Sequence, residues 1–170
     1  MTLEIRLEAF EARALGVLVE KALTTPEQYP LTLNAVVNGA NQKSNREPVL
    51  SLSDDAVSEA LDGLIDKELA RKVFPGNSRV DKYCHTATST LKIDVTQLAV
   101  LAELLMRGPQ SPAELRTRAG RMLPIDSAEQ LSAVLDALSA RSMVERVPPG
   151  RGYRAERFVQ LLCPGLHGLD

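Results

Sequence analysis

The chain has 170 residues, of which 44% are hydrophobic and 25% charged, and its formal net charge is −2. This is a globular composition, and the length allows one ordinary domain or two small ones of about 80 residues each. The charge balance excludes any argument for nucleic-acid binding from a basic composition, but it leaves a local basic patch open. Because no apolar run approaches the ~20 residues that cross a bilayer, we expect a cytoplasmic protein without membrane contact.

The first predicted helix occurs twice. Residues 15–23 (LGVLVEKAL) match residues 98–106 (LAVLAELLM), and both segments are expected to form a buried helix. The identical positions are Leu15 and Leu98, Val17 and Val100, Leu18 and Leu101, and Glu20 and Glu103.

Two further helices follow in each copy. A short helix is expected after Thr32 and after Ser111, because a hydroxyl side chain can cap each helix, and Ser111 with Glu114 has capping-box spacing. Longer amphipathic helices are expected after Ser53 and Ser127, since apolar residues recur there at helical spacing.

A two-stranded hairpin closes each copy. Residues 70–74 and 79–85 flank Pro75-Gly76, and residues 143–147 and 153–159 flank Pro149-Gly150. Residues 86–90 (TATST) are polar and non-periodic, so we expect a linker there. The offset between the copies falls from about 83 to about 74 residues, which places an insertion around residues 41–52 of the first copy.

Three helices closed by a hairpin follow the plan of a winged helix-turn-helix, whose hairpin is the wing. The sequence therefore predicts a mostly α (α+β) fold of two tandem winged-helix domains, residues 1–88 and residues 89–170 with the C-terminal tail. Each copy has its own apolar stripes and is expected to fold separately.

Four segments resemble the YceH-like bacterial proteins: residues 18–49, 60–73 (ALDGLIDKELARKV), 75–83 (PGNSRVDKY) and 107–122 (RGPQSPAELRTRAGRM). The resemblance covers nearly the whole chain, and the part after Val159 is the least typical. It implies tandem winged helices of unassigned biochemical role, sometimes grouped with regulators, and it supplies no catalytic residues.

The third helix of a winged helix usually enters the major groove of DNA. Residues 53–69 are poorly suited to this, because they carry six acids against Lys67 alone, and phosphates would repel them. Residues 127–141 are close to neutral. The simpler interpretation is that these helices pack the core and that their acids keep the surface soluble.

Positive charge gathers on the hairpins and on the second copy's short helix, where it could hold duplex DNA by its phosphates with little base readout. A solvated surface is the alternative. The candidate residues are Arg71, Lys72, Arg79 and Lys82 on the first hairpin, Arg151, Arg154 and Arg157 on the second, and Arg116, Arg118 and Arg121 near the short helix.

The inserted loop has a dense run of hydrogen-bonding side chains: Asn41, Gln42, Lys43, Asn45 and Arg46. Such a loop could bind a ligand or partner, or it could be a capped turn whose side chains satisfy its own backbone. Its glycine spacing is not that of a phosphate-binding loop.

No catalytic or metal-binding pattern is recognisable. Cys84 and His85 would point to opposite faces of a strand, and Cys163 and His167 lack two further ligands nearby. We therefore expect no enzymatic activity, no cofactor and no metal, and we expect the two cysteines to be reduced thiols.

Two interaction hypotheses remain, duplex DNA held by the basic wings or a protein partner held by the acidic third helices and the polar loop. An apolar stripe in residues 3–23, which includes Leu3, Leu7, Phe10, Ala14 and Val17, also predicts a homodimer. The tail, residues 161–170, either docks on a neighbouring domain or frays.

Overall fold

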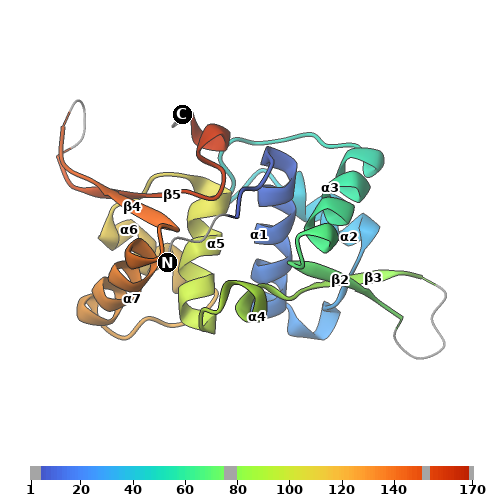
Figure 1. The fold of residues 1–170 in the computed structure, drawn as a ribbon, viewed down its shortest axis with the longest axis horizontal. Coiled ribbons are helices and arrows are strands. Elements are labelled where there is room, and N and C mark those ends of the chain that lie inside the picture. Colours follow the sequence, from blue (N-terminus) through green and yellow to red (C-terminus); the bar gives the residue numbers. More distant parts are fainter. Residues whose placement is uncertain (1–4, 75–79, 151–153, 169–170) are drawn as a thin grey trace.

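The computed structural model describes residues 5–74, 80–150 and 154–168. The first half contains α1 (Ala9–Thr24), a 3-10 turn (Pro26–Gln28), β1 (Leu31–Thr32), α2 (Leu33–Ala40), α3 (Asp54–Asp66), β2 (Ala70–Val73) and β3 (Lys82–His85). After α4 (Ala87–Leu91), the second half contains α5 (Val95–Arg107), α6 (Pro112–Ala119), α7 (Ala128–Ala140), β4 (Val144–Val147), β5 (Arg157–Gln160) and a 3-10 turn (Pro164–His167). The fold is α+β, and the order of three helices and a hairpin occurs twice (Figure 1).

The predicted helix starts are confirmed. The hydroxyl of Thr32 accepts a hydrogen bond from Ala35 N at 3.1 Å, and that of Ser53 accepts one from Ala56 N at 3.1 Å. Ser111 and Glu114 form the expected capping box, and Ser127 caps α7. These side chains satisfy amide groups that a helix leaves unpaired at its N-terminus, so they fix where each helix begins.

Both hairpins form, and the first has an extra strand that was not expected. In the first half β2 pairs with β3, and the two-residue β1 pairs with the other edge of β3 through Leu31 and Tyr83. In the second half β4 pairs with β5, and an isolated bridge between Gln110 and Phe158 occupies the place that β1 has in the first half. The returning strands are shorter than predicted, since β3 begins at Lys82 and β5 at Arg157.

The prediction of a linker at residues 86–90 was wrong. The segment forms α4, in which Ala87 and Leu91 are fully buried. The hydroxyls of Thr86 and Thr90 both donate to the carbonyl of Glu68, so the polar residues hold this helix to the end of α3. The helix could not be predicted from the sequence, because two apolar residues spaced four apart are too few to show helical periodicity and Leu91 lies just beyond the polar run.

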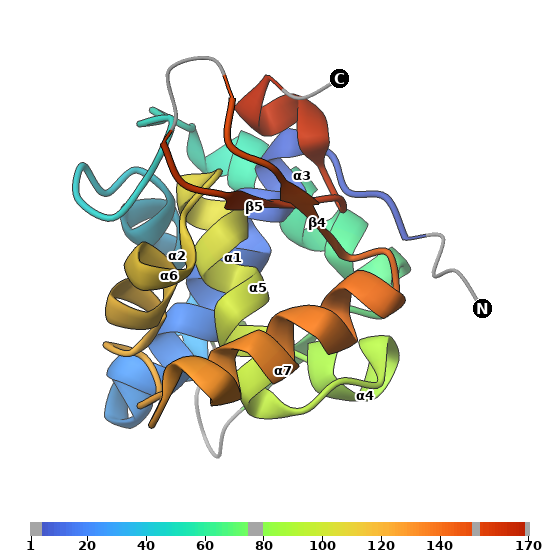
Figure 2. The ribbon, with the colours of Figure 1, turned by 90° about the vertical axis from the view of Figure 1, so that its left-hand side faces the viewer.

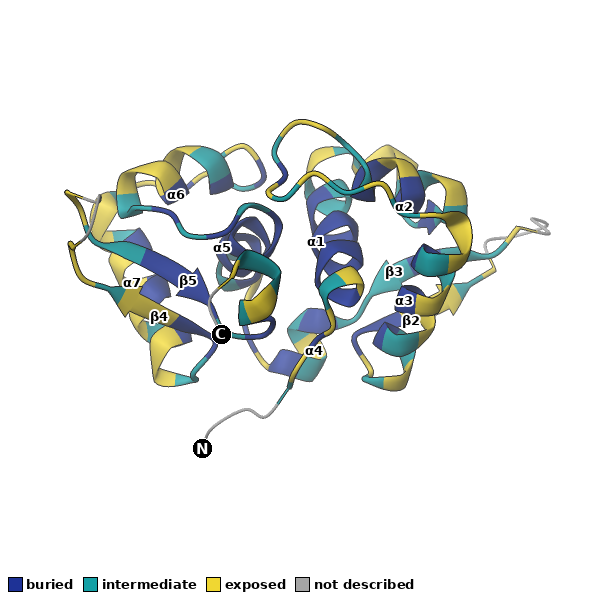
Figure 3. Ribbon diagram, turned by 90° about the horizontal axis from the view of Figure 1, so that it is seen from above, coloured by how far each residue is buried: buried dark blue, intermediate teal, exposed yellow. Residues whose placement is uncertain are grey.

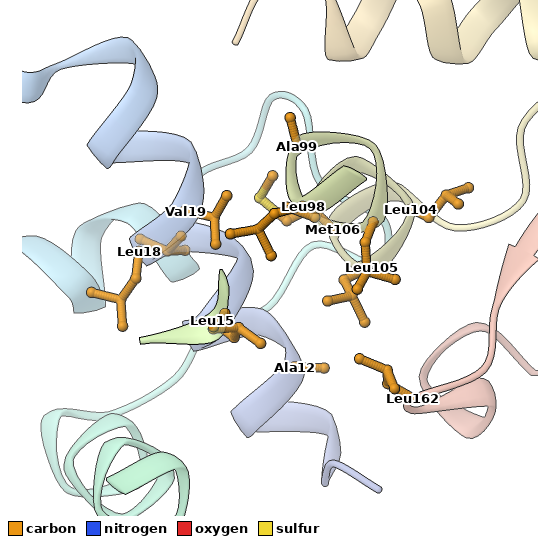
Figure 4. Packing of buried hydrophobic residues seen from close by; sticks show 14 of the residues in the cluster. Ala12, Leu15, Leu18, Val19, Leu98, Ala99, Leu104, Leu105, Met106 and Leu162 are labelled. Carbon is orange, nitrogen blue, oxygen red and sulfur yellow. The ribbon is translucent and has the colours of Figure 1, made fainter. Parts of the chain in front are cut away.

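The two halves share one hydrophobic core. Figures 1 and 2 show α1 and α5 side by side in the middle of the molecule, and both are largely buried in Figure 3. Val19 of α1 lies near Leu98 of α5 in Figure 4. The helices approach closely at Gly16, where an added Cβ would lie 2.5 Å from Met106 Cγ.

This packing buries part of the apolar stripe from which the homodimer was predicted, and the homodimer itself stays a prediction. Leu7, Ala14 and Val17 are buried within the chain, and Phe10 is 42% exposed. Leu3 lies outside the described residues. Leu7 precedes α1, so the stripe begins before the helix does.

The C-terminal tail packs against the rest of the chain. Leu7 N donates to Leu162 O at 2.9 Å, Leu162 and Cys163 are buried, and His167 Nε2 lies 2.9 Å from the carbonyl oxygen of Glu47. Residues 162–167 are therefore docked, as one of the two expectations for the tail had it. In the described part of the chain, no helix is long and apolar enough to span a membrane.

Candidate functional site

The inserted loop is held largely by its own side chains. Asn41 Nδ2 donates to Leu52 O at 2.9 Å, and Leu52 N donates back to Asn41 Oδ1 at 2.7 Å. Gln42 Nε2 donates to Ser44 O at 2.9 Å, and Asn45 adopts a left-handed backbone conformation with φ of 59°. These contacts favour the interpretation of a capped turn, because the polar groups satisfy the loop's own backbone.

A buried arginine of α1 donates hydrogen bonds to the backbone at both ends of the loop. Arg13 donates through Nη1 to Ala40 O at 2.8 Å and through Nη2 to Pro48 O at 2.5 Å. Burial, together with the nearby charge of Arg46, lowers the pKa of Arg13 to about 10. Arg13 was not predicted as a functional residue, although a lone arginine among the apolar residues of a predicted buried helix is a signal that could have indicated it.

Arg46, predicted as a binding residue of the loop, is buried and bonded to α1. Its Nη2 lies 2.6 Å from Glu20 Oε1, and its Nη1 lies 3.1 Å from Glu20 Oε2. Burial alone would raise the pKa of Glu20, but the hydrogen bonds and charges of Arg46 and Arg121 outweigh it and lower that pKa to about 2. Glu20 is therefore ionised and fully paired at neutral pH.

The equivalent glutamate of the second half lies in the same cluster. Arg121 Nη2 is 2.7 Å from Glu20 Oε2 and 3.4 Å from Glu103 Oε1, and Arg107 Nε is 3.3 Å from Glu103 Oε2. Within the described residues, Glu103 Oε2 accepts no well-formed hydrogen bond. Burial therefore raises the pKa of Glu103 in spite of the charges of Arg107 and Arg121.

The inserted loop also ties the first half to the second. Glu47 N donates to Met106 O at 2.8 Å, and Arg107 Nη2 donates to Asn45 Oδ1. His167 reaches the carbonyl of Glu47 from the C-terminal tail. Of the loop residues singled out from the sequence, Lys43 alone is exposed with no contact recorded among the described residues.

The three basic candidates near α6 are engaged within the chain. Arg116 Nη2 donates to Asp126 O at 2.9 Å, Arg118 Nη2 lies 3.2 Å from Glu114 Oε2, and Arg121 joins Glu20 and Glu103. Arg121 was placed with the surface bases because its acidic partners are distant in sequence.

Fewer of the basic candidates on the hairpins than of those near α6 are bonded to other groups of the described chain. Arg71 is exposed and Lys82 half-buried, whereas Lys72 Nζ lies 3.6 Å from Asp81 Oδ2 and 5.9 Å from the centre of the Tyr83 ring. Arg154 is exposed, and Arg79 and Arg151 lie outside the described residues. The first hairpin and α6 lie at opposite ends of the molecule (Figure 1), so the structure does not bring these candidates together in one patch.

The third helix of the first half has a strongly acidic exposed face. The one base of this segment, Lys67, bonds to Glu11 of α1 and is half-buried. The exposed acids are Asp54, Asp55, Glu59, Asp62, Asp66 and Glu68. Phosphate would be repelled here, and a positively charged surface would be attracted.

A hollow of about 320 Å³ lies between α6, α7 and β5 in the second half. Its buried lining is apolar and includes Leu131, Leu135 and Phe158. The polar and charged residues of its lining are Arg116, Ser132, Asp136 and Glu156. This hollow could not be predicted from the sequence, because the apolar residues that line it are of the same kind as those of a packed core. The described residues contain no cluster of three or more His, Cys, Asp and Glu side chains that could hold a metal ion.

Comparison with known proteins identifies the family. A family model described as "Protein of unknown function, DUF480" matches residues 7–152. The chain is 48% identical to a UPF0502 protein of Geotalea daltonii over 163 residues, which cover 95% of this chain and 74% of the relative. It is 42% identical to a UPF0502 protein of Klebsiella pneumoniae over 174 residues (98% and 80%) and 40% identical to one of Vibrio parahaemolyticus over 168 residues (95% and 78%). The chain therefore belongs to the DUF480, or UPF0502, family of bacterial proteins.

Proposed function

We propose that the chain is a non-enzymatic binding module made of two winged-helix units, and that its partner is a protein. The repeated order of three helices and a hairpin supports the winged-helix interpretation. The short third strand, β1 in the first half and the Gln110–Phe158 bridge in the second, adds to that support, because it gives both halves the same pattern of pairing.

The exposed face of α3 carries the proposal. In a winged helix that reads DNA, the third helix approaches the phosphates, and a helix there needs basic or neutral side chains. The side chains exposed on α3 include Asp54, Asp55, Glu59, Asp62 and Asp66, and Lys67 is bonded to Glu11. A partner protein with Lys and Arg side chains on its surface would complement this face.

The second candidate function is non-specific binding of duplex DNA through the first hairpin. It is favoured by Arg71 and Lys82, for which no ion pair is recorded among the described residues. Contacts of this kind would hold phosphates with little base readout, and their strength would fall steeply with salt.

One experiment separates the two. Fluorescence anisotropy with duplex DNA at low salt is measured for the unmodified protein, for Arg71→Glu with Lys82→Glu, and for Asp62→Asn with Asp66→Asn. We expect no binding by the unmodified protein. Binding that is weakened by the first double variant and tightened by the second would establish the DNA function instead.

The protein partner is tested with the same acidic variant as bait. Proteins retained by the immobilised unmodified chain should be lost with Asp62→Asn and Asp66→Asn. They should be kept by Asp126→Asn with Glu129→Gln, which removes two exposed acids from the other half. Retention that does not distinguish the two baits would contradict a docking role for α3.

A further inference from the structure

The docked C-terminal tail contains a histidine that contacts three other parts of the chain. His167 Nε2 lies 2.9 Å from the carbonyl oxygen of Glu47 in the inserted loop, and His167 Nδ1 lies 3.1 Å from Gln160 Nε2 at the end of β5. The ring also packs on Gly108 after α5, where an added Cβ would lie 2.9 Å from His167 Cδ2. The imidazole therefore joins the inserted loop, the second half and the tail at one point.

The side-chain amide of Gln160 is fixed in one orientation by the backbone of the tail. Its Oε1 accepts a hydrogen bond from Cys163 N at 2.7 Å, and its Nε2 donates one to Cys163 O at 2.5 Å. Turning the amide over would break both bonds, because donor would then face donor and acceptor would face acceptor. Gln160 is fully buried, so the second hydrogen of Nε2 would be costly to leave unpaired, and His167 Nδ1 is the acceptor in front of it.

These partners determine where the imidazole carries its proton. Nδ1 faces an N–H group of Gln160 and must be unprotonated, whereas Nε2 faces the carbonyl of Glu47 and must carry the hydrogen. The docked ring of His167 is therefore neutral. A second proton, on Nδ1, would set two N–H groups against each other, and Gln160 could turn away only by losing both of its bonds to the tail.

The surroundings of the ring also disfavour a positive charge. Burial lowers the pKa of His167 below its ordinary value of 6.5, and the charge of Arg13 on α1 lowers it further, while Glu47 acts in the opposite direction without outweighing them. Two more ionisable side chains adjoin the contact in sequence, the buried thiol of Cys163 on the tail and Arg107 at the end of α5, which is paired within its own helix. The docked ring therefore takes up a proton less readily than the ring of a released tail.

We propose that residues 163–168 form a pH-sensitive latch, which neutral His167 holds against the inserted loop and which protonation of that ring releases. The release is local, because Leu162 points into the buried core in Figure 4 and its carbonyl accepts a hydrogen bond from Leu7 N. It uncovers the carbonyl of Glu47 at the junction of the two halves. The latch lies apart from the exposed face of α3, so this proposal does not depend on the protein partner proposed above.

The direction and size of the pH effect follow from the two states of the ring. Because the pKa of His167 is lower in the docked tail than in the released one, docking is insensitive to pH well above 6.5 and weakens as the pH falls below it. One group with an ordinary histidine pKa in the released tail can shift the docking equilibrium by at most about tenfold between pH 7.5 and 5.5.

Amide hydrogen exchange of the full chain, followed by NMR, measures the release. The reporter is Cys163 N–H, which bonds to Gln160 Oε1 only in the docked tail, and its protection is the intrinsic exchange rate at each pH divided by the observed rate. We expect this protection to fall by about threefold or more between pH 7.5 and 5.5. Val100 N–H, in the buried part of α5, should stay far more protected than Cys163 at both pH values, which shows that the chain remains folded.

Three variants identify the group responsible. His167→Gln keeps a donor and an acceptor but does not titrate, so the protection of Cys163 N–H should no longer change with pH. His167→Lys carries a permanent charge, and its protection at pH 7.5 should be as low as that of the unmodified chain at pH 5.5 or lower. The matched control is His85→Gln, which removes the other histidine, whose pKa burial also lowers, and it should keep the pH-dependent fall.

Four results would overturn the proposal. The first is protection of Cys163 N–H that does not change between pH 7.5 and 5.5. The second is a fall that persists in His167→Gln, and the third is a fall that disappears in His85→Gln, which would assign the effect to His85. The fourth is a titration of the His167 ring signals at or above pH 6.5 in the folded chain, because docking would then favour the charged ring.

Discussion

Glu20 of α1 and Glu103 of α5 occupy equivalent positions in the two repeats and meet at one side chain, Arg121, whose Nη2 lies 2.7 Å from Glu20 and 3.4 Å from Glu103. Both carboxylates are buried, yet their environments differ. Glu20 is held by two charge-assisted hydrogen bonds from Arg46, whereas one oxygen of Glu103 accepts no well-formed bond in the described chain. Because a buried charge is costly unless it is paired, Glu20 should contribute more to stability than Glu103.

Substitution of the two glutamates should therefore give unequal results. Glu20→Gln leaves the fully buried Arg46 without a carboxylate and should lower the free energy of unfolding by about 3 kcal/mol or more. Glu103→Gln removes a poorly paired buried charge and should stay within about 1 kcal/mol of the unmodified protein. Urea denaturation followed by circular dichroism measures both values.

Losses of equal size would mean that the pairing of Glu20 is no better than that of Glu103. The double variant gives a further check. Because both glutamates contact Arg121, the changes in the free energy of unfolding caused by the two single substitutions should not add up in the double variant.

The loss of stability at acidic pH should be caused largely by the protonation of Glu20. Its pKa in the folded chain is about 2, below the ordinary value of 4.5, so its contribution is present above about pH 4.5 and is lost as the pH falls towards 2. The pKa of Glu103 is raised, so its protonation on acidification favours the folded chain and partly offsets that loss.

The free energies of unfolding of the unmodified protein and of Glu20→Gln should therefore differ most at neutral pH. The difference should shrink as the pH falls below about 4. A difference of constant size from pH 7 to pH 3 would show that the ionised form of Glu20 is not what stabilises the fold.

These contacts also show what the sequence could reveal. Caps, helix order and hairpins depend on neighbouring residues, and Ser111, Ser127 and Thr32 therefore marked their helices correctly. The match of Glu20 to Glu103 was visible as a repeat, but its ionic partners were not. Arg46 and Arg121 are paired across 26 and 101 residues, and residue spacing carries no signal for such contacts. The two-residue β1 is too short to produce a periodic pattern.

The contact between α1 and α5 is sensitive to a single methyl group at Gly16. An added Cβ would lie 2.5 Å from Met106 Cγ and 3.2 Å from its sulfur, so Met106 would have to move within a packed core. We expect Gly16→Ala to lower the free energy of unfolding by about 1–3 kcal/mol. Thermal or urea denaturation measures this loss.

Shortening the neighbour provides the control. Met106→Ala opens a cavity and is destabilising alone, but combined with Gly16→Ala it relieves the overlap. The double variant should lose less than the sum of the two singles by at least about 0.5 kcal/mol. Strict additivity would rule out a direct clash between these positions.

The same interface bears on whether the halves fold separately. A cut at Ser89 divides α4 and leaves each fragment with three other helices and a hairpin, the basis for expecting independent folding from the sequence. It also exposes the faces of α1 and α5 and removes Arg121 from Glu20. The inserted loop further loses its bonds to Met106 and His167. A fragment of about 85 residues has little stability to spare for such losses.

We therefore expect residues 1–88 and residues 89–170, each expressed alone, to lack a cooperative melting transition, and an equimolar mixture to regain one. Circular dichroism melts of the fragments, the mixture and the intact chain decide this. Binding between the fragments should be weaker when the first carries Glu20→Gln, because the bridge to Arg121 crosses the cut. Cooperative melting of both fragments, with a mixture equal to their sum, would instead show that the repeats are independent domains and that the ionic cluster only orients them.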